Sequence, residues 1–231
     1  MKPVKINHIY TYPFTSRSDL IHYLDNQHKI LIAVNAEKII KRNPRLEGII
    51  NNNIGYADGI GAVKALKRKG FNGVEKIPGC ECWLEIIRHF ESEKSFYFVG
   101  STDEVINQTI KKLHQEFPRL KILNFRSGFL KNGEKNRLIT DLQEKAPDIV
   151  FVAMGTPRQE YLMEELLQKH PALYMGLGGS FDVYTGNVKR APTFFINTGL
   201  EWFYRLLRQP TRIKRQLILL KFFWKLYFGR M

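Results

Sequence analysis

The chain has 231 residues, of which 44% are hydrophobic and 13% aromatic, enough to bury the core of one sizeable α/β domain. This composition excludes a disordered or low-complexity chain, and no repeat of fixed period occurs. The 36 Lys and Arg residues against 22 Asp and Glu residues give a formal net charge of +14, which favours a polyanionic partner: nucleic acid, acidic lipid or a phosphorylated ligand. Residues 200–231 alone carry eight basic residues and one acid, so half of the surplus lies in this last segment.

Cysteine usage and hydropathy indicate the compartment. The two cysteines, Cys80 and Cys82, lie too close together for a good disulfide, and no second pair or histidine cluster completes a zinc site. Residues 1–14 lack the apolar core of a signal peptide, and no run of about 18 uncharged apolar residues occurs. We therefore expect reduced thiols, no membrane span and a protein that stays in the cytoplasm.

Short β-rich runs alternate with longer helical patterns along the chain. The expected strands are Val4–Ile9, Ile30–Val34, Ser95–Val99, Lys121–Asn124, Asp148–Met154 and Ala172–Leu177. The expected helices are Arg17–Asp25, Ala36–Lys41, Gly61–Lys69, Glu81–Phe90, Asp103–Phe117, Glu134–Lys145 and Arg158–Lys169. The alternation predicts an α/β fold with a parallel sheet covered by helices on both faces, in which ligands bind where the strands lead into the helices.

Three expected strand ends carry glycine with small polar residues: Val99–Thr102, Met154–Pro157 and Leu177–Ser180. Glycine lets backbone N–H groups approach a phosphate, and the helix that follows supplies a positive dipole. The three loops together favour a nucleotide-diphosphate site that includes Gly100, Ser101, Gly155 and Thr156. The dinucleotide fingerprint G-x-G-x-x-G and the Walker A sequence are both absent, which disfavours a dehydrogenase or a P-loop kinase.

Two polar residues at expected helix starts have two interpretations each. Asn35 follows the strand Ile30–Val34, where an N-cap worth about 1 kcal/mol is the favoured interpretation. Asp58, within Ala57–Gly61, is either another capping residue or a general base on a glycine-flanked loop.

Two later segments have residues that secondary structure does not explain. In Gly155–Glu160, Pro157 and Glu160 suit a first helical turn, but capping does not account for Gln159. The segment Gly178–Pro192 mixes aromatic, acidic, glycine and basic residues without a helix or strand period, so we interpret it as a binding loop.

Five ordered motifs resemble those of the WecG/TagA/CpsF glycosyltransferases. They are Ala57–Gly61, Gly155–Glu160, Gly178–Asp182, Arg190–Pro192 and Gly199–Leu206, and the resemblance extends from about Asn35 to Arg215. It implies a Rossmann-like fold with a C-terminal appendage. It also implies inverting transfer of a sugar from a UDP-sugar to an N-acetylglucosamine or other sugar on undecaprenyl diphosphate. Such enzymes serve teichoic acid, enterobacterial common antigen, capsule and O-antigen assembly at the cytoplasmic face of the bacterial cell membrane.

The resemblance also implies roles for single residues. Asp58 becomes the candidate general base, and Asn35 and Gln159 line the sugar and diphosphate pocket. Arg205, Arg212 and Arg215 match appendage arginines that close over the site and meet phosphate. The expected donor-binding set is completed by Lys76, Gly100, Ser101, Gly155, Thr156 and Asp182.

Four departures from the family pattern leave the reaction class intact and the donor sugar open. Ala33 stands where many members have Thr, Ala57 where Pro is usual, and Lys76 where Arg is common. Glu81 lies where an Asp usually follows the glycine, here Gly79. Galactose or glucose is the favoured donor sugar, with N-acetylmannosamine next.

The sequence gives no firm indication of a cofactor. No Asp-x-Asp pair occurs and the six histidines are scattered, so arginine is the expected counter-charge for the departing UDP. We predict no metal site from the residues, and a divalent cation, Mn²⁺ or Mg²⁺, stays open.

The basic tail is expected to form one helix, Ile213–Phe228, after Pro210. Lys214, Lys221 and Lys225 share a narrow stripe at about 100° per residue. Apolar residues cover most of the remaining surface: Leu217, Leu219, Leu220, Phe222, Phe223, Trp224, Leu226, Tyr227 and Phe228. This pattern favours an interfacial helix, with lysines toward anionic headgroups and aromatic residues such as Trp224 toward acyl chains.

Alternatives to these interpretations stay open. The tail helix can instead pack on the core or on another subunit of a homo-oligomer. No known nucleic-acid module matches, so we expect no nucleic-acid partner. We expect a catalytic domain over residues 1–198 and a membrane-associating appendage over residues 199–231. The alternative function is a non-catalytic protein that binds nucleotide sugars or lipid phosphates on the same scaffold.

Overall fold

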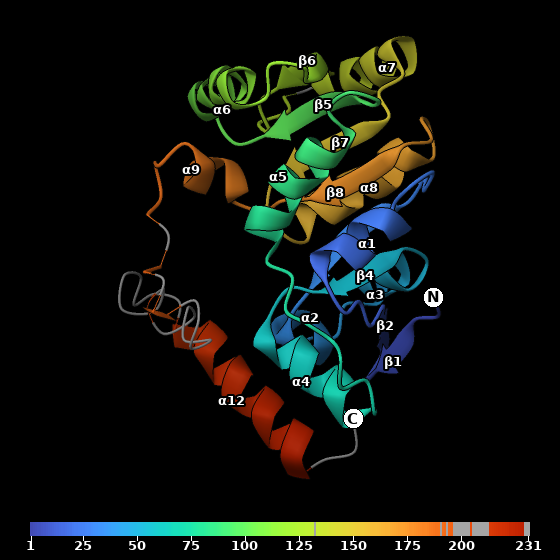
Figure 1. The fold of residues 1–231 in the computed structure, drawn as a ribbon, viewed down its shortest axis with the longest axis vertical. Coiled ribbons are helices and arrows are strands. Elements are labelled where there is room, and N and C mark those ends of the chain that lie inside the picture. Colours follow the sequence, from blue (N-terminus) through green and yellow to red (C-terminus); the bar gives the residue numbers. More distant parts are fainter. Residues whose placement is uncertain (132, 190, 193, 196–203, 205–212, 229–231) are drawn as a thin grey trace.

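The computed structural model describes residues 1–131, 133–189, 191–192, 194–195, 204 and 213–228. Its centre is a six-stranded sheet in the order β4-β3-β8-β7-β5-β6, in which neighbouring strands are parallel (Figure 1). The strands are β3 (Ile30–Val34), β4 (Ile54–Ala57), β5 (Ser95–Gly100), β6 (Lys121–Arg126), β7 (Ile149–Ala153) and β8 (Leu173–Gly176). The carboxyl ends of these strands therefore meet at one edge of the sheet.

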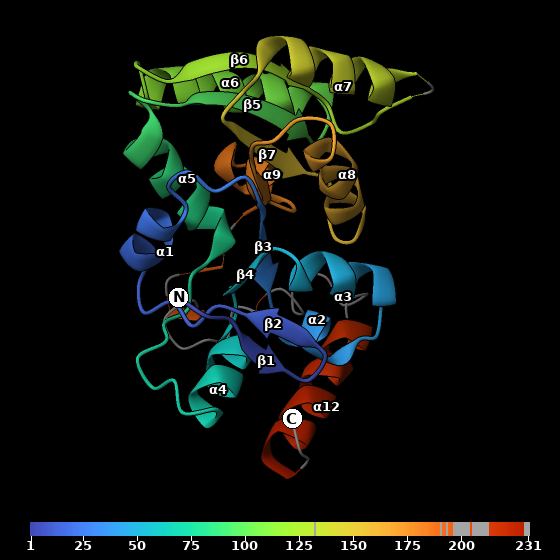
Figure 2. The same ribbon diagram turned by 90° about the vertical axis from the view of Figure 1, so that its right-hand side faces the viewer.

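Helices cover both faces of the sheet, as Figure 2 shows. One face is packed by α1 (Arg17–Tyr23), α5 (Gly79–Phe90), α6 (Asp103–Glu116) and α9 (Ser180–Tyr184). The other is packed by α2 (Ala36–Ile40), α3 (Pro44–Asn51), α4 (Ile60–Arg68), α7 (Glu134–Lys145), α8 (Arg158–Leu167) and α12 (Ile213–Phe228). Because both faces are buried, the central strands read as nearly continuous apolar runs, and the predicted α/β class is confirmed.

The first predicted strand, Val4–Ile9, is wrong as a single element. Asn7 adopts a left-handed φ of 56°, which breaks the run into the antiparallel hairpin of β1 (Val4–Ile6) and β2 (Ile9–Thr11). The Tyr12 N–H then donates to the Gly55 carbonyl at 2.8 Å, which attaches the hairpin to β4.

Strand β4 and helix α3 are among the elements that the sequence pattern did not predict. Strand β4 has only four residues and includes Gly55, where an added Cβ would lie 2.8 Å from the Tyr10 carbonyl oxygen. Helix α3 begins with Asn43 as N-cap, whose side chain accepts from the Leu46 N–H, and with Pro44 in the first turn. Both are standard helix-start signals, so the sequence did carry evidence for α3.

Part of the segment interpreted as a binding loop is regular structure. Residues Ser180–Tyr184 form the short helix α9, and the Phe181 side chain is fully buried against Trp83 of α5. Phe181 is therefore a core residue, although Asp182 beside it remains half-buried at the edge of the sheet.

The predicted tail helix is confirmed as α12, and one of its faces packs on the sheet-covering helices. The Phe222 ring is fully buried, and a Cβ added at Gly61 of α4 would lie 3.1 Å from its Cε1 atom. Leu226 is also buried, and the Lys64 ammonium lies 5.2 Å from the centroid of the Phe223 ring. The alternative of a helix docked on the core therefore holds for this face of α12. The predicted domain boundary at residue 199 lies outside the described residues and stays a prediction.

Asp148, which directly precedes β7, is hydrogen-bonded to Ser95, the first residue of β5. Its carboxylate accepts from the Ser95 N–H at 2.7 Å and from the Ser95 hydroxyl at 2.6 Å. Partial burial raises the pKa of this carboxyl, but the Ser95 hydrogen bonds outweigh that effect and hold the pKa below its ordinary value.

We predict that Asp148→Ala destabilises the protein at neutral pH. Because the folded pKa is lowered, the contribution of Asp148 is fully present above the unfolded pKa of about 3.9 and is lost as the pH falls through the folded value. Thermal melts of wild type and variant from pH 7 to pH 3 should therefore converge at the acid end. The control is Asp25→Ala, since Asp25 is 60% exposed and its ion pair with Lys94 spans 3.8 Å. A difference in melting temperature that stays constant with pH would contradict this assignment.

Candidate functional site

The ends of β3 and β4 bring Asn35 and Asp58 side by side. Val34 and Ala57 are register partners, and the Asp58 N–H continues the ladder by donating to the Val34 carbonyl at 3.1 Å. Asn35 follows as the N-cap of α2, with its Oδ1 accepting from the Lys38 N–H at 3.1 Å, so the capping interpretation of Asn35 is confirmed. Gly59 lies against Asn35, since a Cβ added there would approach the Asn35 Cβ to 3.8 Å.

Asp58 caps a helix other than the one that follows it in the chain. Its Oδ1 accepts from the Gly79 N–H at 2.8 Å, at the first residue of α5, whereas the N-cap of α4, Gly59, provides no side-chain hydrogen bond. The positive end of the α5 dipole favours the ionised carboxylate.

The segment that precedes α5 lies along the end of β4. The Ile77 N–H donates to the Ala57 carbonyl at 2.8 Å, which places the half-buried Lys76 in the segment next to Asp58. Tyr56 is completely buried below Asp58, and burial together with the Asp58 charge raises the pKa of its hydroxyl well above the ordinary value. Burial also raises the pKa of the Cys82 thiol to about 12, in keeping with the predicted inert, reduced thiol.

The β5 end places Ser101 against Asp182. Gly100 has a φ of 147°, and a Cβ there would lie 2.4 Å from the Ala153 carbonyl oxygen, so this position requires glycine. The Ser101 N–H donates to the same Ala153 carbonyl at 2.9 Å. The Ser101 hydroxyl lies 3.2 and 3.4 Å from the two carboxylate oxygens of Asp182, so the structure brings together these two predicted site residues.

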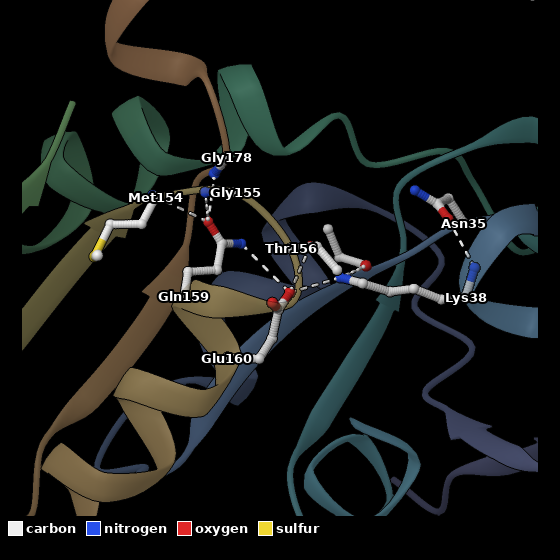
Figure 3. Close-up of polar contacts among 9 residues, drawn as sticks. Asn35, Lys38, Met154, Gly155, Thr156, Gln159, Glu160 and Gly178 are labelled. Atoms are coloured by element: carbon white, nitrogen blue, oxygen red, sulfur yellow. Dashed lines mark hydrogen bonds and ion pairs between the residues drawn. The ribbon is translucent and has the colours of Figure 1, made fainter. Parts of the chain in front are cut away.

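Gln159 connects the loops that follow β7 and β8 (Figure 3). Its Oε1 accepts from the Gly178 N–H at 2.9 Å, from the Gly155 N–H at 3.1 Å and from the Met154 N–H at 3.4 Å. The residue is 4% exposed, and a Cβ at Gly176 would lie 2.4 Å from its Nε2. The amide is therefore held inside the protein, where its hydrogen bonds connect the loops that follow β7 and β8.

Next to Gln159 is a buried ion pair that no pattern in the sequence indicates. The Lys38 ammonium lies 2.8 Å from Oε1 of Glu160 and 2.9 Å from the Ala33 carbonyl oxygen. The same Oε1 accepts from the Thr156 hydroxyl at 2.8 Å. Figure 3 shows how Lys38 reaches from α2 to the start of α8, so that the pair joins the β3 end to the β7 end.

The predicted appendage residues are described only in part. Arg205 and Arg212 lie outside the described residues, and α12 contains Lys214 and Arg215 at positions whose side chains the structure does not describe. Further along α12, Lys221 is exposed and Lys225 half-buried, and Trp224 is 63% exposed.

The described residues contain no group of three or more His, Cys, Asp and Glu side chains that could hold a metal ion. No helix among them is both long enough and apolar enough to cross a bilayer.

Residues 8–231 match the family model described as "Glycosyl transferase WecG/TagA/CpsF family". The chain belongs to the WecG/TagA/CpsF glycosyltransferase family. The match covers nearly the whole chain, so it includes both the sheet edge with Asp58 and the C-terminal helix. The family implies a glycosyltransferase of surface polysaccharide synthesis with a nucleotide-sugar donor and a lipid-linked acceptor.

Because its amide oxygen serves three N–H groups, we predict that Gln159→Ala destabilises this glycosyltransferase. Each buried donor left without an acceptor costs about 1–3 kcal/mol, and in a chain of this size each kcal/mol lowers the melting temperature by about 2–4 °C. The expected drop, measured by thermal melts, is at least about 5 °C.

The matched control for that variant is Gln168→Ala, at the exposed end of the same helix. Its melting temperature should stay within about 1 °C of wild type, as expected for a surface substitution. An unchanged melting temperature for Gln159→Ala with a raised KM for UDP-sugar would instead place the amide on the donor.

Proposed function

We propose that the protein is an inverting glycosyltransferase that uses a UDP-sugar and extends a GlcNAc-type sugar on undecaprenyl diphosphate. Galactose or glucose is the favoured donor sugar, with N-acetylmannosamine next, and the product serves O-antigen, capsule or teichoic acid synthesis. The proposal places the enzyme in the cytoplasm, bound to the inner face of the bacterial cell membrane. The observation that carries it is the half-buried Asp58 carboxylate at the sheet edge of a chain that belongs to this family.

The surroundings of Asp58 support its role as general base. Inverting transfer needs a base that takes the proton of the acceptor hydroxyl as that oxygen attacks the anomeric carbon. Asp58 is held in place by its own N–H, which donates to Val34, and by the Gly79 N–H, which donates to its carboxylate. Asn35 lies on the neighbouring strand end, where its amide can contact the sugar.

The departing UDP needs positive charge, which the proposal assigns to the basic C-terminal segment. Lys76 lies in the segment next to Asp58, and residues 200–231 carry eight Lys and Arg residues. We assign Arg205, Arg212 and Arg215 to the diphosphate, as the family resemblance implies. Preorganised positive groups stabilise developing negative charge where water is excluded.

The described part of α12 supports membrane association. With Phe222 and Leu226 buried on the protein side, four apolar side chains remain exposed on the rest of the helix: Leu220, Trp224, Tyr227 and Phe228. Lys221 is exposed as well, next in sequence to Leu220. A helix that presents aromatic residues and lysine to solvent fits the headgroup region of an anionic bilayer.

We predict that Asp58→Asn lowers turnover by a factor of about 10²–10⁴, the usual loss on removal of a general base, while the fold is preserved. The asparagine oxygen can still accept from the Gly79 N–H, so the melting temperature should change little. The measurement is UDP release from UDP-galactose, UDP-glucose and UDP-N-acetylmannosamine in the presence of an undecaprenyl-diphosphate-GlcNAc analogue.

Two outcomes of that assay would count against the proposal. A variant with more than a tenth of wild-type turnover would remove Asp58 from the role of base. Wild-type protein that binds a UDP-sugar in calorimetry, but transfers no sugar to any acceptor tested, would favour the non-catalytic binding protein.

We predict that Leu220→Ser combined with Trp224→Ser weakens binding to phosphatidylglycerol vesicles without lowering the melting temperature, since both side chains are more than 60% exposed. Phe222→Ala is the matched comparison on the same helix. It should lower the melting temperature, because removal of a buried Phe side chain typically costs about 3–5 kcal/mol. Vesicle sedimentation and thermal melts measure the two effects, and sedimentation of the serine variant equal to wild type would place the membrane contact elsewhere.

A further inference from the structure

At two strand ends, the hydroxyl groups of Thr156 and Ser101 donate their protons to carboxylates. A serine or threonine hydroxyl has one proton to donate and two lone pairs that accept. The Thr156 hydroxyl donates to Glu160 at 2.8 Å, and the Ser101 hydroxyl lies 3.2 Å from Oδ2 of Asp182. A carboxylate can only accept in such a contact, so each hydroxyl offers lone pairs to a ligand.

Backbone donors of the same loops are occupied as well. The N–H groups of Gly155 and Gly178 donate to the Gln159 amide oxygen, and the Ser101 N–H donates to the Ala153 carbonyl. These are the loops whose glycines suggest a phosphate cradle. In this structure the N–H groups of Gly155, Gly178 and Ser101 donate to acceptors within the protein, so they do not donate to a phosphate oxygen.

The Lys38–Glu160 pair fixes the direction of the Thr156 hydroxyl. Its side chains are 6% and 1% exposed, and the Lys38 ammonium is enclosed by Glu160 and the Ala33 carbonyl. The Lys38 ammonium and the Thr156 hydroxyl both donate to Oε1 of Glu160, so the Thr156 proton lies on the protein side. The Lys38 charge is thereby paired with the Glu160 carboxylate inside the protein.

We propose that Thr156 accepts a hydrogen bond from a hydroxyl group of the sugar nucleotide, and that Lys38 and Glu160 are positioning residues that turn its lone pairs toward that group. This inference rests on the proposed function. The hydroxyl belongs either to the donor sugar or to the ribose, and the diphosphate is bound by cationic groups outside these loops. Ser101, whose proton is held by Asp182, has the same acceptor character at the β5 end.

The test compares two double variants that both remove the buried ion pair. Lys38→Met with Glu160→Gln leaves an amide oxygen that can accept from Thr156, whereas Lys38→Met with Glu160→Leu leaves none. Replacement of both charges of a buried pair by neutral groups of similar volume commonly preserves stability, so melting temperatures are measured for both. The control is Arg45→Met with Glu164→Gln, which removes a more exposed ion pair of 3.2 Å between α3 and the same α8, and its kinetics should match wild type.

We expect KM for the UDP-sugar used by the wild type to be about two- to tenfold higher in the Glu160→Leu variant than in the Glu160→Gln variant, the range that corresponds to one hydrogen bond. Thr156→Val should raise KM by a similar factor, and Thr156→Ser should restore most of the loss. Equal KM values for the two double variants, or for Thr156→Val and wild type, would overturn the inference.

Deoxy substrates then distinguish the sources of the hydroxyl. If the partner is on the sugar, Thr156→Val should no longer raise KM for one of the 2-, 3-, 4- or 6-deoxy UDP-sugars, whereas it should still raise KM for UDP-sugars with 2′-deoxyribose or 3′-deoxyribose. If the partner is the ribose, the pattern reverses. Should every deoxy substrate keep the full response, Thr156 contacts no substrate hydroxyl and the inference fails. Wild-type protein without any transfer would instead contradict the proposed function, so the two failures can be told apart.

Discussion

The requirement that buried polar groups be paired organises the carboxyl edge of the sheet. Three strand-end loops meet there, and their N–H groups and side chains would be costly to bury alone. Gln159 accepts from the loops after β7 and β8, and Glu160 beside it accepts from Thr156 and from Lys38 on α2. Two adjacent residues of α8 thus connect the ends of β3, β7 and β8. The site geometry depends on this polar network more than on any single loop.

The long periodic elements were predictable from the sequence, since a parallel sheet with two buried faces leaves continuous apolar runs and amphipathic helices. The strand Ile30–Val34 and the tail helix Ile213–Phe228 have the predicted bounds. Strand β4 was not predictable in this way, because four residues are too few for a period and Gly55 is explained only by the approach of Tyr10. Asn7, which divides the first hairpin, shows the same limit, because its left-handed backbone depends on the pairing of β1 with β2.

The sequence singles out residues of the candidate site, but few of their contacts. Asn35 follows the predicted strand Ile30–Val34, and Asp58 lies on a glycine-flanked loop at an expected helix start; the sheet register brings the two together. That Asp58 caps α5 depends on a contact across 21 residues of sequence, and that Lys38 pairs with Glu160 depends on one across 122. Local pattern carries no information about such pairs. From the sequence alone, a lysine near a helix start such as Lys38 is expected to be solvated, and its burial follows only from the tertiary fold.

In the proposed function, the charge distribution gives the C-terminal segment a second role besides membrane contact. The described sheet edge carries the carboxylates of Asp58, Asp182 and Glu160, and its buried lysine is already paired with one of them. A diphosphate brought to such an edge needs cations. Besides Lys76 in the segment next to Asp58, half of the surplus positive charge lies in residues 200–231. Helix α12 packs through Phe222 against Gly61, three residues after Asp58. In the proposed function, the helix that meets the membrane is therefore also attached to α4, the helix that follows Asp58 in the chain.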